Sequence, residues 1–297
     1  YLEKDYVSGI VNNSWGADYT YTYADVDKDD KVLNLATSSD IPTLDLSKAT
    51  DQQSFQTANT TMEGLTRVDA EGKVQPGVAE SWETSEDGLT WTFKLRKNST
   101  WSNGTPVTAH DFEYSWKRTL TPETAAEYSY IMADIVGSST KEIQENGVDG
   151  VGVKALDDYT LEVKLNRPVA YFAELVSFQV FFPQNQAFVE SCGDAYGSAA
   201  DKQLYNGPFT LTSWKMEDQF TMEKNPNYWD AANVKLNKIN TKVVKDTGAE
   251  VSLYEDGQID RAILSSDYVD KYKDSKELKT REVASIFMLQ INGGNHK

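Results

Sequence analysis

The fold is decided by residues 75–118, which read QPGVAESWETSEDGLTWTFKLRK followed directly by NSTWSNGTPVTAHDFEYSWKR. In the first part Trp91, Phe93 and Leu95 alternate with polar residues, the period of a strand with one buried and one solvated face. The pair Asp87-Gly88 stands before that strand and tolerates the positive φ of a tight hairpin turn. The stretch therefore opens with a predicted β-hairpin.

The second part of the stretch predicts a helix after a turn at residues 102–104. Thr108 is placed as the N-cap, and Asp111 follows three residues later, which is the spacing of a capping box. Phe112 and Trp116 then share one helix face at i and i+4. We expect one aromatic cluster beneath this unit, because three tryptophans lie close together in sequence, at positions 91, 101 and 116.

These residues resemble the signature region of a known family. The runs AESWE, DGLTWTFKLRK and WSNGTPVTAHDFEYSWKR match, in order and spacing, the extracellular solute-binding proteins of family 5 type that serve oligopeptide and dipeptide ABC importers. Nickel-binding proteins share their fold. Further matching blocks are LNLATSSDIPTLD at 33–45, MEGL at 62–65, YNGPFTL at 205–211 and KNPNYWD at 224–230. The resemblance covers about residues 32–297 and corresponds to the N-terminal portion of a family member.

The resemblance implies an α/β fold with mixed α+β sheets, of the periplasmic-binding-protein-like class II, with two lobes and an inserted extra domain. We expect residues 1–31 to be a loosely packed lead-in, residues 32–63 and 184–284 to form a discontinuous domain I, and residues 64–183 to form the inserted domain II. Residues 285–297 are expected to be a hinge strand and the start of a truncated domain III. Most of the second lobe is expected to lie outside this chain.

Several further elements are predicted from local patterns. Residues 32–36 read as a buried strand, and residues 159–165 alternate as a half-buried strand after a turn at 157–158. Helices are predicted from Asp51 to a C-cap at Gly64, over residues 121–135, and over residues 247–255. Strands are expected to begin at Gln258 and to cover residues 287–292.

Composition excludes several classes of function. The chain has 297 residues and a formal net charge of −17, with no basic stripe that could neutralise phosphates, so we expect no nucleic-acid partner. No run approaches the roughly 18 apolar residues of a membrane span. The first five residues, YLEKD, lack the apolar core of a signal peptide.

The resemblance also implies a location. A secretion signal and a lipid-bearing cysteine are expected to be absent from this chain. The protein is expected at the extracellular face of the bacterial cell membrane, held by a lipid anchor of the Gram-positive type, or alternatively in the periplasm.

Two motifs fit cofactor or metal binding only superficially. Residues 25–30 carry four aspartates, but a calcium loop fails because Asp30 stands where the sharp-turn glycine belongs and Ala36 where the last glutamate belongs. GVGVKA at 150–155 resembles a dinucleotide-binding turn, but a strand and a turn follow it instead of a helix. We therefore expect no cofactor and no metal.

Catalysis has little support in the sequence. There is no G-x-S-x-G or H-E-x-x-H motif, and His110 and His296 are the only histidines. Cys192 is the only cysteine and has no basic partner nearby in sequence, so we interpret it as an inert thiol. We expect a binding protein and assign no catalytic residue.

The resemblance places ligand-binding positions at six residues. The backbone of Thr50, Asp51 and Gln52 is expected to pair with an extended peptide, Tyr128 to reach in from the inserted domain, and Ser265 and Ser285 to lie near the hinge. An ordinary surface or packing role is the alternative for each. The expected partners are an oligopeptide and the permease subunits of the importer, and the expected state is a monomer.

Other functions stay open from the sequence. The same fold could bind another cargo, such as a dipeptide, a peptide pheromone, a nickel chelate or an opine. A surface adhesin or signalling receptor is an alternative from another class, and an enzyme is the third.

Overall fold

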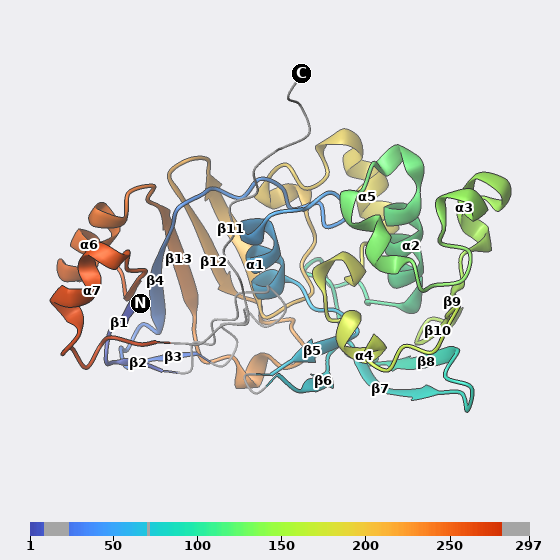
Figure 1. Ribbon diagram of the computed structural model, residues 1–297, viewed down its shortest axis with the longest axis horizontal. Helices are drawn as coiled ribbons and strands as arrows, with labels where there is room; N and C mark the ends of the chain where they lie inside the picture. Colours follow the sequence, from blue (N-terminus) through green and yellow to red (C-terminus); the bar gives the residue numbers. More distant parts are fainter. Residues whose placement is uncertain (9–23, 70–71, 281–297) are drawn as a thin grey trace, which may run out of the picture.

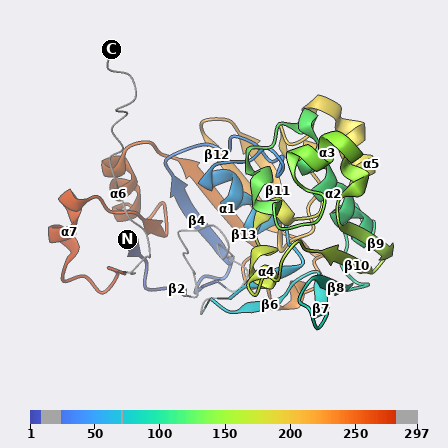
Figure 2. The ribbon, with the colours of Figure 1, turned by 45° about the vertical axis from the view of Figure 1, so that its right-hand side comes forward.

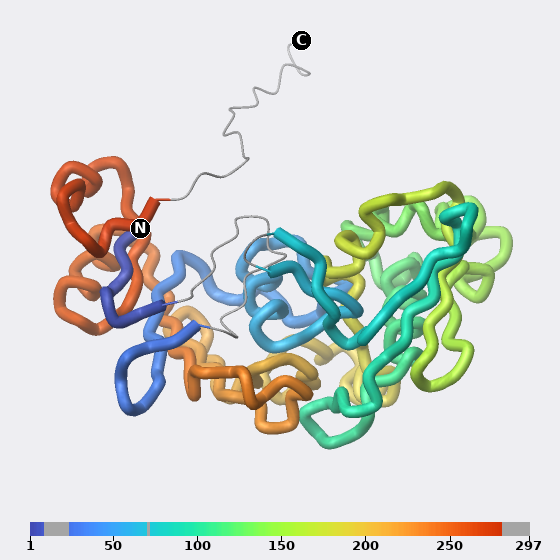
Figure 3. Tube along the Cα trace, turned by 90° about the horizontal axis from the view of Figure 1, so that it is seen from below, coloured from blue at the N-terminus to red at the C-terminus, as the bar shows by residue number. Residues whose placement is uncertain are grey.

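The computed structural model describes residues 1–8, 24–69 and 72–280, and it is an elongated mixed α/β structure built on two four-stranded sheets (Figure 1). Seen from below, helices α6 (Thr247–Glu255) and α7 (Ser266–Tyr272) lie at one end and the strands of the second sheet at the other (Figure 3). The expected combination of helices with mixed sheets is confirmed.

The first sheet has the strand order β11-β12-β13-β4 and mixed direction. β4 (Val32–Thr37) runs parallel to β13 (Lys238–Val243), while β12 (Gln219–Lys224) is antiparallel to β13 and to β11 (Phe209–Lys215). The buried apolar side chains alternate along these strands and include Leu33, Leu35, Phe209, Leu211, Met222 and Ile239. Helix α1 (Gln52–Thr61) lies in front of this sheet (Figure 1).

A row of hydrogen-bonded polar side chains crosses three strands of the same sheet. Thr221 Oγ1 donates to Asn240 Oδ1 at 3.2 Å, and Asn240 Nδ2 donates to Asn34 Oδ1 at 3.0 Å. These residues are register partners and alternate with the buried apolar ones, so the row lies on the opposite face of the sheet. The alternation gives the sheet one apolar face, toward α1, and one polar face.

The second sheet is antiparallel, with the order β7-β8-β10-β9. Its strands are β7 (Ala79–Thr84), β8 (Thr90–Leu95), β9 (Val153–Asp157) and β10 (Thr160–Lys164). Both predicted hairpins are confirmed, and Gly88 in the first turn has the positive φ of +71° that its position requires. Helix α2 (Ala109–Leu120) packs against β9 and β10 (Figure 2).

Trp91, Trp101 and Trp116 share one hydrophobic core but differ in their aromatic contacts. The ring of Trp91 lies 5.3 Å from that of Phe172, whereas Trp116 packs edge-on against Phe181 at 5.1 Å. Trp101 is fully buried in the same core. The expected cluster therefore exists as a continuous core whose aromatic contacts are spread along the unit.

The remaining elements are short. The strands are β1 (Leu2–Glu3), β2 (Val7–Ser8), β3 (Asp25–Val26), β5 (Thr66–Val68), β6 (Val74–Pro76) and β14 (Arg261–Ala262). The helices are α3 (Thr140–Asn146), α4 (Phe172–Leu175) and α5 (Gln186–Cys192). The prediction of a helix over 247–255 is confirmed by α6, and the strand expected from Gln258 begins three residues later, as β14.

Two helix predictions are wrong in part. Residues 121–135 form two 3₁₀ segments, η1 (Pro122–Thr124) and η2 (Glu127–Met132), because Ala125 between them is left-handed at φ 53° and interrupts the helix. Gly64 does not cap α1, which ends at Thr61 with an extended Met62 after it. A Cβ on Gly64 would lie 2.6 Å from the ring of Phe182, so close packing requires glycine there.

The expectation of a loosely packed lead-in is wrong for residues 1–8 and 24–31. Leu2 is fully buried and Val7 nearly so. β1 pairs with β14, and β2 pairs with β3. These ends of the lead-in are therefore attached to the part of the chain around residues 260–262.

The chain passes twice between the two sheets, and the crossings are held by buried polar groups. Glu63 N–H donates to Asn206 Oδ1 and Asn206 Nδ2 donates to Glu63 O, both at 3.0 Å. The Glu63 carboxylate accepts from Tyr228 OH at 2.5 Å and from Trp229 Nε1 at 2.6 Å. Burial raises the pKa of Glu63 although Arg67 opposes the shift. These bonds attach Glu63, where the chain leaves the first sheet, to Asn206, Tyr228 and Trp229, which lie in the part of the chain that returns to that sheet.

Some predictions lie outside the described residues, namely the strand at 287–292, Ser285 and His296. Within the described ranges, no helix has the length and apolar character needed to cross a membrane. In the same ranges no three His, Cys, Asp or Glu side chains come together as a metal site. Asp25 of the acidic stretch pairs instead with Lys31 at 3.2 Å.

Candidate ligand-binding site

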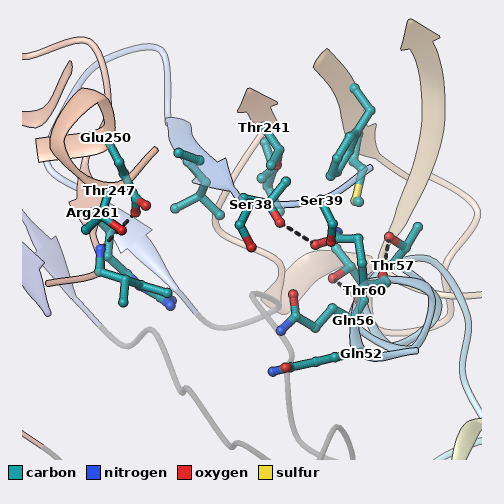
Figure 4. Close-up of a pocket in the computed structure, with 18 residues that line it drawn as sticks. Ser38, Ser39, Gln52, Gln56, Thr57, Thr60, Thr241, Thr247, Glu250 and Arg261 are labelled. Atoms are coloured by element: carbon teal, nitrogen blue, oxygen red, sulfur yellow. Dashed lines mark hydrogen bonds between the residues drawn. The ribbon is translucent and has the colours of Figure 1, made fainter. Parts of the chain in front are cut away.

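A pocket of about 290 Å³ lies between α1, the first sheet and the α6–β14 segment (Figure 4). Gln52 and Gln56 of α1 stand on one side, and Thr247, Glu250 and Arg261 stand on the opposite side (Figure 4). Ser38 and Ser39, which directly follow β4, lie between these two walls. Segments far apart in sequence thus meet around one space.

The α1 wall is polar without being charged. Gln52, Gln53, Gln56, Thr57 and Thr60 line the pocket, and their spacing puts them on one face of the helix. The other face carries Phe55 and Ala58, which are buried in the core. The helix begins where it does because Asp51 is its N-cap, and its side chain accepts from Ser54 N–H at 2.8 Å.

Internal bonds hold part of this wall in place and leave part of it accessible. Gln53 Oε1 accepts from Thr37 Oγ1 at 2.7 Å, which ties α1 to the end of β4. Thr57 and Thr60 each donate to the carbonyl four residues earlier, at 2.9 Å. Gln52 is exposed and Gln56 is half-buried. The amide groups of these two glutamines are therefore placed to exchange hydrogen bonds with a ligand.

The floor of the pocket is apolar except for one hydroxyl. It is formed by Phe220 and Met222 of β12 and by Ile239 and Thr241 of β13. These side chains are buried on the α1 side of the sheet. The pocket thus combines an apolar floor with a wall of amides and hydroxyls that can orient a ligand by hydrogen bonds.

The opposite wall carries one negative and one positive group. Glu250 is 7% exposed and accepts from Ile263 N–H at 2.8 Å, and burial raises the pKa of its carboxyl group. Arg261 is also 7% exposed, and its guanidinium lies 5.2 Å from the Tyr1 ring. The positive charge of Arg261 offsets part of this increase in the pKa of Glu250. The two charges therefore compensate each other locally, and the pocket as a whole has little net charge.

The residues predicted from the sequence fall at different distances from this pocket. Gln52 lines it, Asp51 is engaged as the N-cap of α1, and Thr50 is exposed immediately before the cap. Ser265 is the N-cap of α7, two residues after Ile263, which lines the pocket. Ser285 lies outside the described residues.

Tyr128 approaches α1 from the side of the second sheet. It lies in η2, is half-buried, and packs edge-on against Phe55 of α1 with ring centroids 5.7 Å apart. Phe55 belongs to the helix whose polar face lines the pocket. The structure therefore brings Tyr128 to the same helix as Gln52, on the face turned toward the other sheet.

Sequence reasoning missed most of the pocket, including Ser38, Ser39, Gln56, Thr241, Glu250 and Arg261. One signal was available: α1 reads QQSFQTANTT and contains amides and hydroxyls at helical spacing with no charged residue. Such side chains supply hydrogen-bond donors and acceptors without charge, so this pattern favours a binding surface for neutral polar groups.

The other side chains considered for chemistry lie elsewhere. His110 is in the first turn of α2, is largely exposed, and its Nε2 lies 3.4 Å from Asp158 Oδ1. Cys192 is a free, half-buried thiol at the end of α5. Neither residue lines the pocket. The pocket presents neutral donors and acceptors on the α1 wall and a Glu250–Arg261 charge pair on the opposite wall.

Comparison with known proteins gives consistent matches. The sequence model described as bacterial extracellular solute-binding proteins, family 5 Middle, matches residues 73–296. The oligopeptide-binding protein OppA of Bacillus subtilis is 35% identical over 291 residues, which is 95% of this chain and 53% of that protein.

Solved structures agree in fold. The substrate-binding domain of an oligopeptide ABC transporter from Bacillus anthracis is 47% identical with a TM-score of 0.82, and the match covers 84% of this chain and 48% of that one. Listeria monocytogenes OppA bound to peptide is 42% identical with a TM-score of 0.81, covering 84% and 49%. The chain thus spans about half the length of the relatives that it matches.

Proposed function

Because this chain belongs to the bacterial extracellular solute-binding proteins of family 5, we propose that it is the substrate-binding component of an ABC importer and that it captures oligopeptides. Proteins of this family bind solutes and are not enzymes. The observation that carries the choice of cargo is the uncharged polar wall of α1 above an apolar floor. Such a wall recognises groups that every peptide has and does not select by charge.

The proposed mode of binding is addition of an extended peptide along the start of α1. The backbone of Thr50, Asp51 and Gln52 pairs with the peptide, and the side-chain amides of Gln52 and Gln56 bond further peptide groups or bridging waters. Thr50 and Gln52 are exposed, which leaves this segment free to pair. The lobes then close on the ligand by a hinge motion, with Ser265 and Ser285 near the hinge.

The domain division is part of this proposal. Domain I consists of residues 32–63 and 184–284, and the inserted domain II of residues 64–183. In support of it, every strand of the first sheet comes from the first set and every strand of the second sheet from the other. Glu63, the last residue before the proposed inserted domain, is bonded to Asn206 of the returning part of domain I.

Location and partners follow from the same proposal. The protein works outside the cytoplasm and delivers peptides to the permease subunits of its importer. We propose a monomer that is held at the membrane through a lipid anchor, as in the expectation for a Gram-positive cell. The location is supported by the description of the family as extracellular.

The proposal is tested by identifying what the protein carries when it is purified gently. The ligand is released by mild denaturation and analysed by mass spectrometry, for this chain and for the polypeptide as its gene encodes it. Peptides of several sequences and similar length are expected from the encoded polypeptide. Absence of peptide from both preparations, or a single non-peptide compound, would overturn the assignment.

A variant pair connects that result to the pocket. One of the released peptides is titrated into the wild type and into Gln56→Leu by calorimetry. Gln186→Leu is the control, because Gln186 is exposed on α5 and bonds Glu190 at 2.8 Å away from the pocket. We expect Gln56→Leu to weaken binding about tenfold, as for the loss of one or two hydrogen bonds, and Gln186→Leu to leave it unchanged.

A further inference from the structure

Tyr130 presents an aromatic ring to solvent in a fixed orientation. The residue is 68% exposed, which alone is ordinary for a surface tyrosine. Its ring, however, is stacked on that of Tyr128, with centroids 5.7 Å apart and planes inclined by 27°. One face of the Tyr130 ring is thus occupied by Tyr128, while most of the residue remains accessible.

This stack rests on an aromatic base that reaches α1 on the helix face opposite its pocket-lining residues. Tyr128 contacts Phe55 at 5.7 Å and Phe178 at 5.8 Å, and the last two rings are 5.0 Å from each other. Phe55 lies on α1 between Gln52 and Gln56, which line the pocket. The four rings therefore form a continuous support, and Tyr130 is its exposed outer member. We call these four residues the aromatic platform.

The segment that carries Tyr130 contains acidic residues and no basic ones. Residues 119–140 contain Glu123, Glu127 and Asp134 and no lysine, arginine or histidine. Asp134 is already paired with Arg167, whose two nitrogens lie 2.7 and 2.8 Å from its oxygens. Glu127 is exposed and starts the 3₁₀ segment η2. Side chains at i and i+3 eclipse in such a helix, so Glu127 and Tyr130 share one edge of it.

We propose that Tyr130 and Glu127 form a subsite for a cationic side chain of the bound peptide. The flat guanidinium of an arginine stacks on the Tyr130 ring and the Glu127 carboxylate compensates its charge. The proposal rests on the proposed function, because it names a preference within the same ligand. An aromatic side chain could also stack on Tyr130, but it would gain nothing from the carboxylate three residues away.

The test compares arginine with citrulline, which has nearly the same shape without the charge. A peptide released from the protein is synthesised in a series that carries arginine at each position in turn, with a matched citrulline series. Affinities are measured by calorimetry for the encoded polypeptide as wild type, Tyr130→Ala, Tyr130→Phe and Glu127→Gln. Met216→Ala is the control, because Met216 is similarly exposed, at 71%, but lies after β11.

At one peptide position we expect arginine to bind about three- to tenfold more tightly than citrulline, the range for a partly exposed cation–π contact with a carboxylate nearby. Tyr130→Ala and Glu127→Gln should each reduce this ratio, whereas Tyr130→Phe and Met216→Ala should keep it. Peptide binding with no arginine preference, or with a preference that Tyr130→Ala leaves intact, overturns the subsite and leaves the proposed function standing. Absence of all peptide binding overturns both.

Discussion

Arg118 and Asp45 form a two-point ion pair, with Nη1–Oδ1 and Nη2–Oδ2 both at 2.7 Å. Arg118 lies on α2, which packs on the second sheet, and Asp45 lies between β4 and α1 on the first. The pair is nearly enclosed, with side chains 15% and 3% exposed. Arg118 also donates to Gln184 Oε1 at 2.8 Å. One ion pair thus joins the two sheet-bearing parts of the chain, with Asp45 in the segment that leads into α1.

Removing the arginine should destabilise the fold strongly. Arg118→Met leaves the buried Asp45 carboxylate without its cation, and such losses cost about 3–5 kcal/mol of unfolding free energy. The matched control is Arg167→Met, because Arg167 also makes a two-point contact with a carboxylate, through Nε and Nη2 to Asp134, while 59% exposed. An exposed pair contributes about 1 kcal/mol or less. Urea unfolding of both variants checks this, and equal losses would contradict the role given to burial.

Local elements could be predicted where the pattern and its caps agree. The helix at 247–255 has Asp246 as its N-cap and Gly257, at φ +70°, just after its end, so its bounds follow from short-range chemistry. Residues 121–135 fail this criterion. Pro122 suits a helix start, but Ala125 adopts the left-handed conformation and interrupts the segment. Alanine has no preference for that conformation, so the sequence does not predict the interruption.

The candidate site could be predicted only in part. Gln52 was found because a family resemblance marked the start of α1. Ser39 is separated by more than two hundred residues from Thr241 and Arg261, and the three meet only through the sheet order and the return of the chain. The local periodicity of the sequence does not determine which distant segments come into contact. The lead-in was misjudged for the same reason, since the partner of β1 is β14, at the far end of the chain.

Asp111 is a buried carboxylate whose titration should be visible in stability. It accepts from Thr108 N–H at 2.8 Å and lies 3.3 Å from Trp101 Nε1. Burial raises the pKa of Asp111 to about 6, although these hydrogen bonds oppose the shift. An aspartate in the unfolded chain titrates near pH ~3.9. The native state therefore binds this proton more tightly than the unfolded chain does. Its contribution to the free energy of unfolding is fully present below pH ~4 and is lost as the pH rises through about 6.

The measurement is the unfolding free energy of the wild type minus that of Asp111→Asn, by urea denaturation from pH 4 to pH 7.5. Asparagine does not titrate, so the subtraction removes other buried acids such as Glu63 and Glu250. We expect the difference to fall by about 2–3 kcal/mol with rising pH. A difference that stays constant, or that rises with pH, would show that the carboxyl group is ionised in the native state throughout this range.

Asp260 is the group that attaches the beginning of the chain to the first sheet. It is fully buried and accepts from Tyr6 OH at 2.5 Å, Lys28 Nζ at 2.9 Å and Asn34 N–H at 2.7 Å. Its own backbone N–H donates at 2.7 Å to the carbonyl of Asn34, which lies in β4. Two segments of the lead-in and one strand therefore depend on a single carboxylate.

Asp260→Asn should release the lead-in while leaving the sheet formed. An amide has one acceptor oxygen where the carboxylate has two, and it carries no charge for Lys28, so about 2–3 kcal/mol should be lost. Lys28 is 33% exposed and can turn to water, which keeps the cost below that of a fully enclosed pair. Hydrogen exchange should accelerate at residues 1–8 and 25–28 and stay slow in β12 and β13.

The double variant with Lys28→Met should lose less than the sum of the single losses, because the unpaired buried charge left by Lys28→Met alone is then gone. Uniform acceleration over the whole sheet would instead mean that Asp260 supports the core, and unchanged exchange at residues 1–8 would mean that the apolar burial of Leu2 and Val7 holds this segment without it.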